Sequence, residues 1–504
     1  MSLATLPSTT SIAIIGAGFA GLGMAIQLRK GGITDFVILE RANSIGGVWR
    51  DNTYPGAACD IPSHLYSYSF ALRFRWSRVY APQRDIYRYL RECVREYGLA
   101  RYVHLACEVK SARYDEGRGV WRLDTAAGAS LQARALITAT GQLNRPAYPD
   151  IPGLEEFRGK IFHSARWDHR YDLRRKRVAI IGTGASAIQF TPRVARKAAQ
   201  VYLFQRSAPY VLPKLDHRFS QLQHRLFDAL PFLYRLARAA VYVLYETLGI
   251  GFVSWRPAMK PLRAAAMWNL RRAITDPQLR SKLTPAYPFG CKRVLFSNDY
   301  YPALARPNVE LITAGIESAG TAGLRTTDRR SYEVDAIILG TGFAATELLA
   351  PIDIVGRAGV RLADAWRDGP EAYLGIAVAG FPNLFMLYGP NTNLGHNSII
   401  YMLESQIRYV MQAIAHLDSM PGACLEVSAQ AQTRYNRRLQ QALGRTVWSD
   451  GCRSWYMNAQ GRLVSNWSGF TFTYRRMTRR FDPSLYELIG AKEPQALASS
   501  VLSH

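Results

Sequence analysis

Two glycine-rich turns constrain the fold of this chain more than any other feature. The first, GAGFAG, occupies residues 16–21, and the second, GTGASA, occupies residues 182–187. Each follows an apolar run that is typical of a buried parallel strand, SIAII before the first turn and RVAII before the second. A strand, a glycine turn and a helix in this order bind the pyrophosphate of a dinucleotide at the helix N-terminus. The chain is therefore predicted to contain two dinucleotide-binding units.

The first unit carries the features of an FAD site. Gly16, Gly18 and Gly21 are expected to serve a tight turn, a close approach of backbone to pyrophosphate, and close helix–strand packing. The second strand of this unit, FVILE, ends in Glu40. An acid at this place binds both ribose hydroxyls and repels a 2′-phosphate, which favours FAD. The other positions expected to contact FAD in this unit are Phe19, Ala20 and Arg41.

The second unit carries the features of an NADPH site. Gly182, Gly184 and Ala187 form the G-x-G-x-x-A variant of the turn. Glu40 lies 24 positions after Gly16, and 24 positions after Gly182 the chain has Arg206. A guanidinium at this place accepts a 2′-phosphate through a planar fork of donors, whereas a solvent-facing arginine at a strand end is the alternative. The other residues expected to contact NADPH here are Thr183, Ala185, Ser186 and Gln189.

Two later strands suggest how the units are connected. ARALITATG (residues 133–141) and DAIILGTGF (residues 335–343) bracket the middle of the chain, and Thr341 and Gly342 in the second are expected cofactor contacts. We predict an α/β fold of two Rossmann-like domains, with an NADPH domain inserted into a split FAD domain. The expected FAD domain is 1–148 and 344–504, the NADPH domain is 149–211 and 290–343, and a helical insertion is 212–289.

The segment FRGKIFHSARWD (residues 157–168) joins the two units and sets their distance and angle. It has the pattern F-x-G-x-x-x-H-x-x-x-W-D, formed by Phe157, Gly159, His163, Trp167 and Asp168. Between two dinucleotide folds, this pattern resembles the fingerprint of Baeyer–Villiger monooxygenases, a branch of the flavin-containing monooxygenase superfamily. The alternative is an interdomain linker with a hydrogen-bonded histidine and a packed tryptophan.

The resemblance continues in residues 44–70, which match the family's GG-x-W…YPGA-x-CD…Y-x-YSF run. It implies that Asp60 lies near the flavin and positions the catalytic arginine, whereas a lone Asp in a loop is usually a turn residue. The flavin contacts expected here are Gly47, Val48, Trp49 and Tyr66. Trp49, Tyr66 and the neighbouring Tyr54 and Tyr68 suit flat contact with an isoalloxazine ring, and simple aromatic core is the alternative for each.

Motifs in the second half of the chain also match the family: a KR pair, a YY pair, RPNV, GPNTNLGHNS and C-x-SWY. The resemblance implies that Lys292 helps to bind the 2′-phosphate, that Arg293 is the active-site arginine beside the flavin, and that Trp455 lies near the nicotinamide ribose. Val109 and Asn391 are further expected cofactor contacts, and His396 is expected to be structural. The family's W-P-G is replaced here by W-S-G at residues 467–469, which leaves the shape of that loop open.

The implied activity is that of an FAD- and NADPH-dependent monooxygenase (EC 1.14.13.-). It would insert one oxygen atom of O₂ next to the carbonyl of a small apolar ketone through a C4a-peroxyflavin, giving an ester or lactone, with Arg293 and Asp60 as catalytic residues. Oxygenation of a sulfide or amine by the same peroxyflavin is the alternative. A flavin disulfide reductase is disfavoured because the sequence has no C-x-x-C pair. No metal-ligand cluster is apparent, and a monomer or homodimer is expected.

Charge and composition bear on partners and location. The net charge is +25, from 63 Lys and Arg against 38 Asp and Glu, and no nucleic-acid motif accompanies it. Residues 236–255 are nearly apolar, and we expect a buried helix pair here, with a helix on a membrane surface as the alternative. Six sparse cysteines argue against a disulfide framework, and the N-terminus does not resemble a signal peptide, so a cytoplasmic location is expected. A basic membrane- or nucleic-acid-binding protein that keeps a flavin fold is the remaining alternative.

Overall fold

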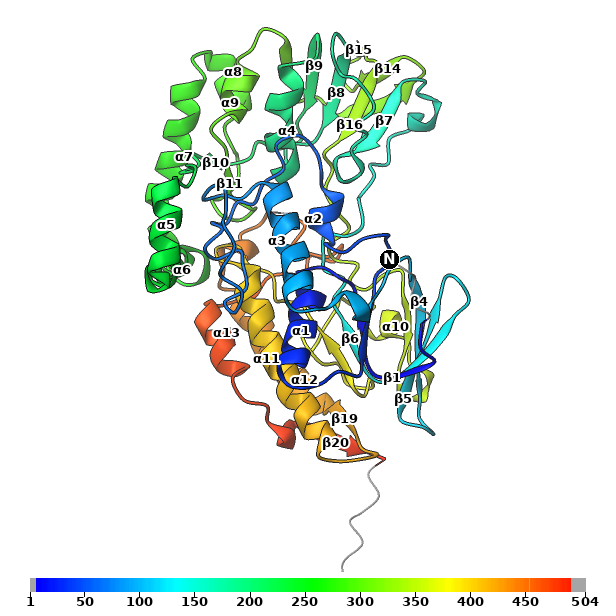
Figure 1. The fold of residues 1–504 in the computed structure, drawn as a ribbon. Helices are drawn as coiled ribbons and strands as arrows, with labels where there is room; N and C mark the ends of the chain where they lie inside the picture. The colour runs from blue at the N-terminus through cyan, green and yellow to red at the C-terminus, as the bar shows by residue number, and fades with distance from the viewer. Residues whose placement is uncertain (1–5, 453, 491–504) are drawn as a thin grey trace, which may run out of the picture.

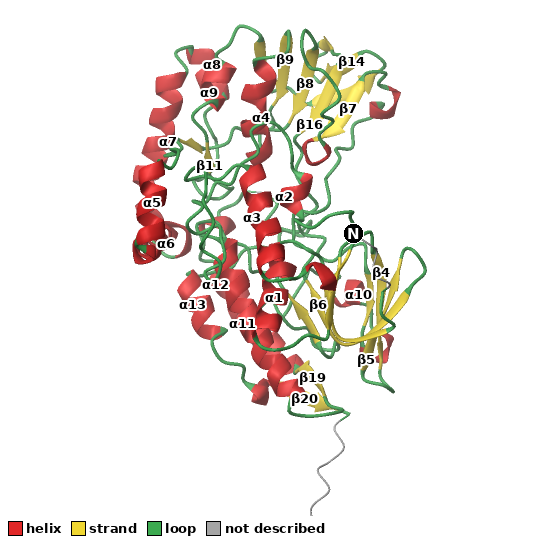
Figure 2. Ribbon diagram, in the orientation of Figure 1, coloured by secondary structure: helices red, strands yellow, loops and turns green. Residues whose placement is uncertain are grey.

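Two separate β-sheets, each carrying one of the glycine turns, organise the protein (Figure 1). The computed structural model describes residues 6–452 and 454–490. Most of the helices gather along one side of the molecule and most of the strands along the other (Figure 2). The fold is α/β, as predicted from the alternation of strand and helix patterns.

The first sheet is built around β1, which ends at the first glycine turn. Its strand order is β17-β4-β5-β6-β1-β2-β3, and β18 also pairs with β6. The neighbours of β1 are parallel to it, and Ile14 lies opposite Ile38 on one side and Ile137 on the other. The strands are β1 (Thr9–Ile15), β2 (Phe36–Leu39), β3 (Val103–His104), β4 (Val109–Asp115), β5 (Val120–Thr125), β6 (Ser130–Thr138), β17 (Asp353–Val355) and β18 (Leu384–Met386).

The second sheet is fully parallel, with strand order β12-β9-β8-β16-β7. Apolar residues bury both of its faces, since α4 and α9 cover one and a three-stranded antiparallel sheet covers the other. Its strands are β7 (Lys160–His163), β8 (Arg177–Ile181), β9 (Gln200–Phe204), β12 (Val309–Ile312) and β16 (Ala336–Leu339), and the covering strands are β13 (Ile316–Gly320), β14 (Gly323–Thr326) and β15 (Ser331–Glu333).

The chain passes between the two sheets twice. It leaves the first sheet after β6, builds the second sheet, and returns after β16 to add β17 and β18 to the first. The two crossings run side by side: the amide of Ala147 donates to the carbonyl of Gly342 at 2.9 Å, and the hydroxyl of Thr341 donates to the carbonyl of Ala147 at 2.5 Å. The outgoing and returning segments therefore fix each other.

Helices pack around the first sheet and between the sheets. On the first sheet, α1 lies against α11, and apolar side chains such as Leu22, Ile26, Ile407 and Val410 share one core. The helices are α1 (Phe19–Lys30), α2 (Val48–Asp51), α3 (Gln83–Glu96), α4 (Ala185–Ala195), α9 (Tyr300–Leu304), α10 (Leu362–Ala365), α11 (Ile399–Asp418), α12 (Ala429–Leu443) and α13 (Thr471–Met477). A two-stranded antiparallel sheet is formed by β19 (Cys424–Val427) and β20 (Tyr486–Ile489). Short 3₁₀ turns are η1 (Ala100–Tyr102), η2 (Leu154–Glu156), η3 (Ser164–Arg166), η5 (Arg357–Gly359), η6 (Val447–Ser449) and η7 (Pro483–Leu485).

The helical insertion forms one edge of the molecule (Figure 1). It contains α5 (Gln221–Ala229), α6 (Pro231–Val253), η4 (Arg256–Met259), α7 (Lys260–Ala273) and α8 (Pro277–Lys282), and a pairing of β10 (Val211–Leu212) with β11 (Leu295–Phe296) spans its base. The expectation of a buried helix pair for residues 236–255 is wrong. One continuous helix, α6, covers most of this range and buries a single face, because Gly249 and Gly251 allow close packing on His396 and Met259 instead of ending the helix.

One disulfide, Cys291–Cys452, is present, although the sparse cysteines had argued against a disulfide framework. The two cysteines are 161 residues apart in sequence, so no local spacing could have indicated the pair. Cys59, Cys93, Cys107 and Cys424 are free thiols.

Candidate active site

The first glycine turn is shaped so that only glycine fits at its key positions. Gly16 has a φ of +109°, and a Cβ there would lie 2.6 Å from the carbonyl oxygen of Ala139. A Cβ on Gly21 would lie 1.9 Å from the carbonyl of Gly16. Gly18 is the N-cap of α1 and makes no side-chain cap hydrogen bond, so the first backbone N–H groups of the helix are left for an anion such as a pyrophosphate.

Glu40 is fixed at the edge of this turn. It directly follows β2, and its carboxylate accepts hydrogen bonds from the amides of Ala17 and Ala42, both at 3.0 Å. Arg50 pairs with the same carboxylate at 2.8 Å. Arg41, by contrast, faces outward and donates to the carbonyl of Asn144 at 3.0 Å. The acid predicted to select a ribose without a 2′-phosphate therefore lies beside the phosphate-binding turn.

The second turn repeats the geometry of the first. Gly182 has a φ of +106°, and a Cβ there would lie 2.5 Å from the carbonyl of Gly340, which follows β16 as Ala139 follows β6. Gly184 is the N-cap of α4, and a Cβ at this position would meet no atom within 4 Å. Ala185 and Ser186 form the first turn of α4, and the hydroxyl of Thr183 donates to the carbonyl of Ser207 at 3.2 Å. The open space over Gly184 fits a phosphate.

Two cations meet beside the second turn. Arg206 lies just past β9, at the end of the strand as expected, and is exposed to solvent, so its role as a phosphate ligand stays a prediction. Lys292 reaches across from the later half of the chain and donates to the hydroxyl of Ser207 at 3.1 Å. Burial, followed by the charge of Arg206, lowers the pKa of Lys292. An anionic group between the two side chains would relieve this repulsion, so the pair fits a 2′-phosphate.

Arg293 and Asp60 form a bidentate ion pair. Nε of Arg293 lies 3.1 Å from Oδ2 of Asp60, and Nη2 lies 2.8 Å from both carboxylate oxygens. Burial alone would raise the pKa of Asp60, but the charge and hydrogen bonds of Arg293 hold it below its ordinary value. Asp60 in turn raises the pKa of Arg293. The pair stays ionised at neutral pH, and 29% of the Arg293 side chain remains exposed, so a bound molecule can reach it.

Three further side chains surround this pair and were not identified from the sequence as site residues. Lys214 donates to the carbonyl of Cys59 at 3.2 Å, and its positive charge helps to lower the pKa of Asp60. Burial raises the pKa of both Tyr388 and Tyr456. Both phenols in turn help to raise the pKa of Arg293. Tyr456 belongs to the SWY motif, which could have indicated it, whereas Lys214 lies in a stretch that carries no pattern.

The aromatic residues that the sequence offered for contact with the flavin divide into two groups. Trp49 in α2 donates to the hydroxyl of Tyr66 at 3.0 Å, next to Gly47 and Val48. Tyr68 is fully buried and donates to the carbonyl of Phe19 at 2.6 Å. Tyr54 donates to the side chain of Gln189 at 3.0 Å. Trp49 and Tyr66 remain candidates for flavin contact, while Tyr54 and Tyr68 are core residues that brace the loop.

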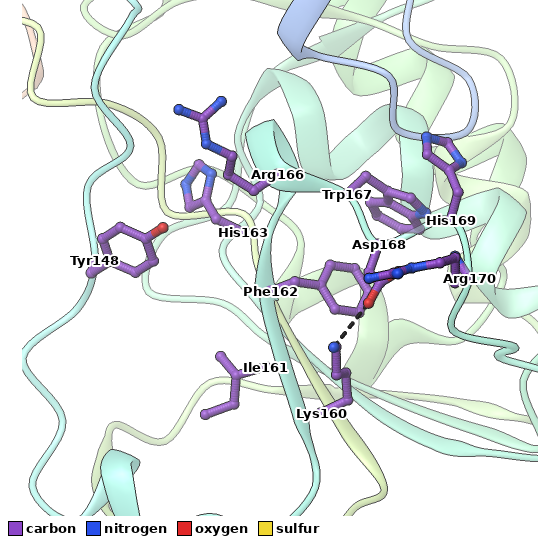
Figure 3. A pocket seen from close by; sticks show the side chains of 10 residues that line it. All are labelled: Tyr148, Lys160, Ile161, Phe162, His163, Arg166, Trp167, Asp168, His169 and Arg170. Carbon is purple, nitrogen blue, oxygen red and sulfur yellow. Dashed lines mark hydrogen bonds and ion pairs between the residues drawn. The ribbon is translucent and has the colours of Figure 1, made fainter. Parts of the chain in front are cut away.

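The fingerprint segment lies at the junction of the two crossings and lines a surface pocket of about 570 Å³ (Figure 3). His163 ends β7 and is buried beneath Tyr148 of the outgoing crossing and Phe343 of the returning one. Its Nδ1 accepts a hydrogen bond from the amide of Ala165 at 3.0 Å. Burial lowers the pKa of His163 to about 4, so the ring is neutral at pH 7. The neutral ring packs between the two crossings and braces the domain junction.

The other fingerprint residues brace the same junction. A Cβ on Gly159 would lie 2.4 Å from the ring of Phe157, which explains the glycine. Trp167 packs between Phe162 and Phe190 of α4, and Asp168 pairs with Lys160 at 2.9 Å (Figure 3). The pattern thus orients the second nucleotide unit through packing.

Three expected cofactor contacts have other partners. Gln189 of α4 donates to the carbonyl of Ala58 at 3.0 Å and so ties the second unit to the loop that carries Asp60. Asn391 is buried and donates to the carbonyls of Leu463 and Asn466. The side chain of Val109 packs in the core of the first sheet. Trp455 lies against Tyr456, with ring centroids 4.5 Å apart, close to the site.

Two nucleotide-binding units together with a half-buried arginine–carboxylate pair define a flavoprotein oxidoreductase. A family described as pyridine nucleotide-disulphide oxidoreductase matches residues 13–220. A Baeyer–Villiger monooxygenase of Pseudomonas aeruginosa is 47% identical over 479 residues, which are 95% of this chain and 91% of that protein. One of Streptomyces coelicolor is 44% identical over 96% of this chain and 95% of that protein.

Solved structures agree with these relatives. The closed crystal structure of cyclohexanone monooxygenase has a TM-score of 0.87 at 26% identity and covers 96% of this chain and all of that one. Oxidised steroid monooxygenase bound to NADP has a TM-score of 0.85 at 31% identity, again over 96% and 100%. The chain belongs to the Baeyer–Villiger monooxygenase family.

Proposed function

We propose that this protein is an NADPH-dependent flavin monooxygenase that inserts one oxygen atom of O₂ next to the carbonyl of an apolar ketone, giving an ester or lactone. The observation that carries the proposal is the bidentate Asp60–Arg293 pair, whose carboxylate lies on a loop that Gln189 ties to the second nucleotide unit. FAD, when bound and reduced by NADPH, would supply the electrons that activate O₂. The protein's own residues would bind the two nucleotides and stabilise the charge that develops on oxygen.

The first unit fits FAD and the second fits NADPH. Glu40 would receive the ribose hydroxyls of FAD, and the N-terminus of α1 would hold its pyrophosphate. Arg206 and Lys292 would hold the 2′-phosphate of NADPH, and the open space over Gly184 admits its pyrophosphate. The fit to FAD rests on the N–H groups of α1 and on Glu40, and the fit to NADPH rests on the two cations and the space over Gly184.

Arg293 would stabilise the negative charge that develops on oxygen during the transfer. Its guanidinium keeps its proton, because Asp60 raises the pKa of Arg293 further. Asp60 uses three contacts to hold the guanidinium in one orientation, so little reorganisation is needed when charge develops. Lys214 adds a second positive charge close to Asp60 and balances the carboxylate.

The cellular setting is part of the same proposal. A cytoplasmic location is proposed because NADPH is an intracellular reductant. We infer a monomer or homodimer that takes a small apolar carbonyl compound and O₂ as substrates.

A panel of ketones and sulfides, incubated with the FAD-loaded protein and NADPH, tests the proposal. Esters or lactones from ketones, in amounts that match NADPH consumption, are the expected products. Sulfoxides without esters would instead support oxygenation of sulfur by the same site, and NADPH oxidation without any oxygenated product would refute both activities.

A further inference from the structure

The outer side of α6 presents an apolar row to solvent. Phe232, Leu236, Val243 and Leu244 are 59%, 63%, 58% and 55% exposed. Leu236 lies four positions after Phe232, Val243 lies seven positions after Leu236, and Leu244 is adjacent to Val243, so the four residues lie along one side of the helix. The buried residues of α6, including Tyr234, Tyr245 and Phe252, lie on the opposite stripe. We call the exposed stripe the α6 face.

Apolar exposure is concentrated in this part of the molecule. Among the large apolar side chains that are exposed within the described residues, most belong to the insertion and the segment leading into it. Leu222, Leu226 and Leu230 continue the exposure through α5 and its end, and Trp255 and Trp268 continue it beyond α6. An extended apolar surface of this kind usually marks an interaction site.

The same region is strongly basic. Residues 221–273 contain eight Arg and Lys but two acids, Asp228 and Glu246, and Glu246 is buried. Arg235 lies on α6 next to the α6 face, and Lys260 and Arg263 follow on α7. A second copy of the chain would bring like charges together, whereas a surface of anionic lipid would satisfy both the charge and the apolar row.

α6 is long and apolar enough to cross a bilayer, but its contacts hold it on the protein. The carboxylate of Glu246 accepts hydrogen bonds from Asn397 at 2.6 Å and from the amide and hydroxyl of Thr471 at 2.6 and 2.9 Å. If α6 left the protein and crossed a bilayer, the carboxylate of Glu246 would lose these hydrogen-bond donors in an apolar medium. The helix can therefore offer only its outer side, as an interfacial helix does.

We propose that the α6 face docks on the surface of an anionic phospholipid bilayer, with the apolar row entering the acyl boundary and Arg235, Lys260 and Arg263 contacting headgroup phosphates. The interaction is peripheral and depends on both apolar and charged side chains. It is independent of the oxygenation reaction, because the α6 face is on the opposite side of the helix from Tyr245, which faces the Asp60 region.

Co-sedimentation with vesicles tests the proposal. The FAD-loaded full-length protein is mixed with vesicles of phosphatidylcholine alone or with phosphatidylglycerol added. We expect binding to the phosphatidylglycerol vesicles that falls as salt is raised. Leu236→Asp combined with Val243→Asp should weaken binding at least about tenfold. Lys260→Glu combined with Arg263→Glu should weaken it in the phosphatidylglycerol vesicles.

A matched control places the same two charges elsewhere. Val360→Asp combined with Leu488→Asp alters two exposed apolar residues outside the insertion and should bind like the unaltered protein. All three double variants should keep NADPH-dependent turnover of a water-soluble ketone, which separates this test from the proposed function. No binding by the unaltered protein, or equal binding by the Leu236–Val243 variant, would overturn the proposal. A dimer in sedimentation velocity that this variant dissociates would show that a second copy covers the α6 face instead.

Discussion

Removing the guanidinium of Arg293 should separate reduction of the cofactor from formation of the product. Arg293 is held by three contacts of 2.8–3.1 Å to Asp60, so it is a fixed charge and not a mobile one. Loss of one such pre-organised donor typically costs about 10²–10³ in rate, or about 3–4 kcal/mol in the barrier. Arg293→Ala should therefore reduce ester formation by about 10²–10³-fold.

Reduction by NADPH should persist in this variant, because Arg206, Lys292 and Gly184 belong to a separate cluster. Arg293→Lys is the matched control: it keeps the charge but cannot bridge both carboxylate oxygens, so we expect an intermediate loss of at least about tenfold. Stopped-flow absorbance follows the bleaching of the flavin, gas chromatography measures the ester, and a thermal melt verifies folding. Ester formation by Arg293→Ala at the unaltered rate would refute the role of this residue.

The remaining predictions concern the NADPH unit and the disulfide. Arg206→Ala should lower the ratio of kcat/KM for NADPH to kcat/KM for NADH by about tenfold, because the charge-assisted hydrogen bonds of the guanidinium to the 2′-phosphate are lost. An unchanged ratio would contradict the assignment of Arg206 to the 2′-phosphate. Because the pKa of Lys292 is lowered, this side chain should lose its charge at a lower pH than an ordinary lysine does. The KM for NADPH should therefore rise as the pH is raised through that range. In Lys292→Ala the KM should depend less on pH. Gly184→Ala should raise KM for NADPH, because the added methyl group enters the space proposed for the pyrophosphate. It should leave Tm unchanged, because a Cβ there meets no protein atom within 4 Å. A lower Tm with a normal KM would contradict the assignment of this space to the pyrophosphate. Peptide mapping without reductant should recover Cys291 linked to Cys452, and finding both as free thiols would contradict this pairing.

Local patterns predicted the fold class, and together with the family resemblance they named several residues that the structure brings together at the candidate site. The two glycine turns appear with the same geometry, each against a strand that returns from later in the chain, as the repeated motifs indicated. Arg206 follows β9 as Glu40 follows β2, which the equal spacing from the two glycine turns indicated, and its contact with a 2′-phosphate stays a prediction. The family resemblance supplied the pairing of Asp60 with Arg293, which are 233 residues apart and share no local signal.

Other features depend on tertiary packing that a single sequence does not display. The exposure of α6 could not be read from its composition, since an apolar helix of this length is compatible with a core, a bilayer or a surface. Lys214 acquires its place beside Asp60 only when the insertion folds back on the loop. Gln189 and Asn391 have amides that suit a cofactor, but the fold gives them backbone partners.

Incorporation of labelled oxygen tests the central claim most directly. The FAD-loaded protein is supplied with NADPH, ¹⁸O₂ and an apolar ketone, and the products are analysed by mass spectrometry. The account predicts an ester or lactone that carries a single ¹⁸O atom at the inserted position, with one NADPH consumed for each molecule formed. Consumption of NADPH with the ketone recovered unchanged, or a protein that does not take up FAD, would contradict it.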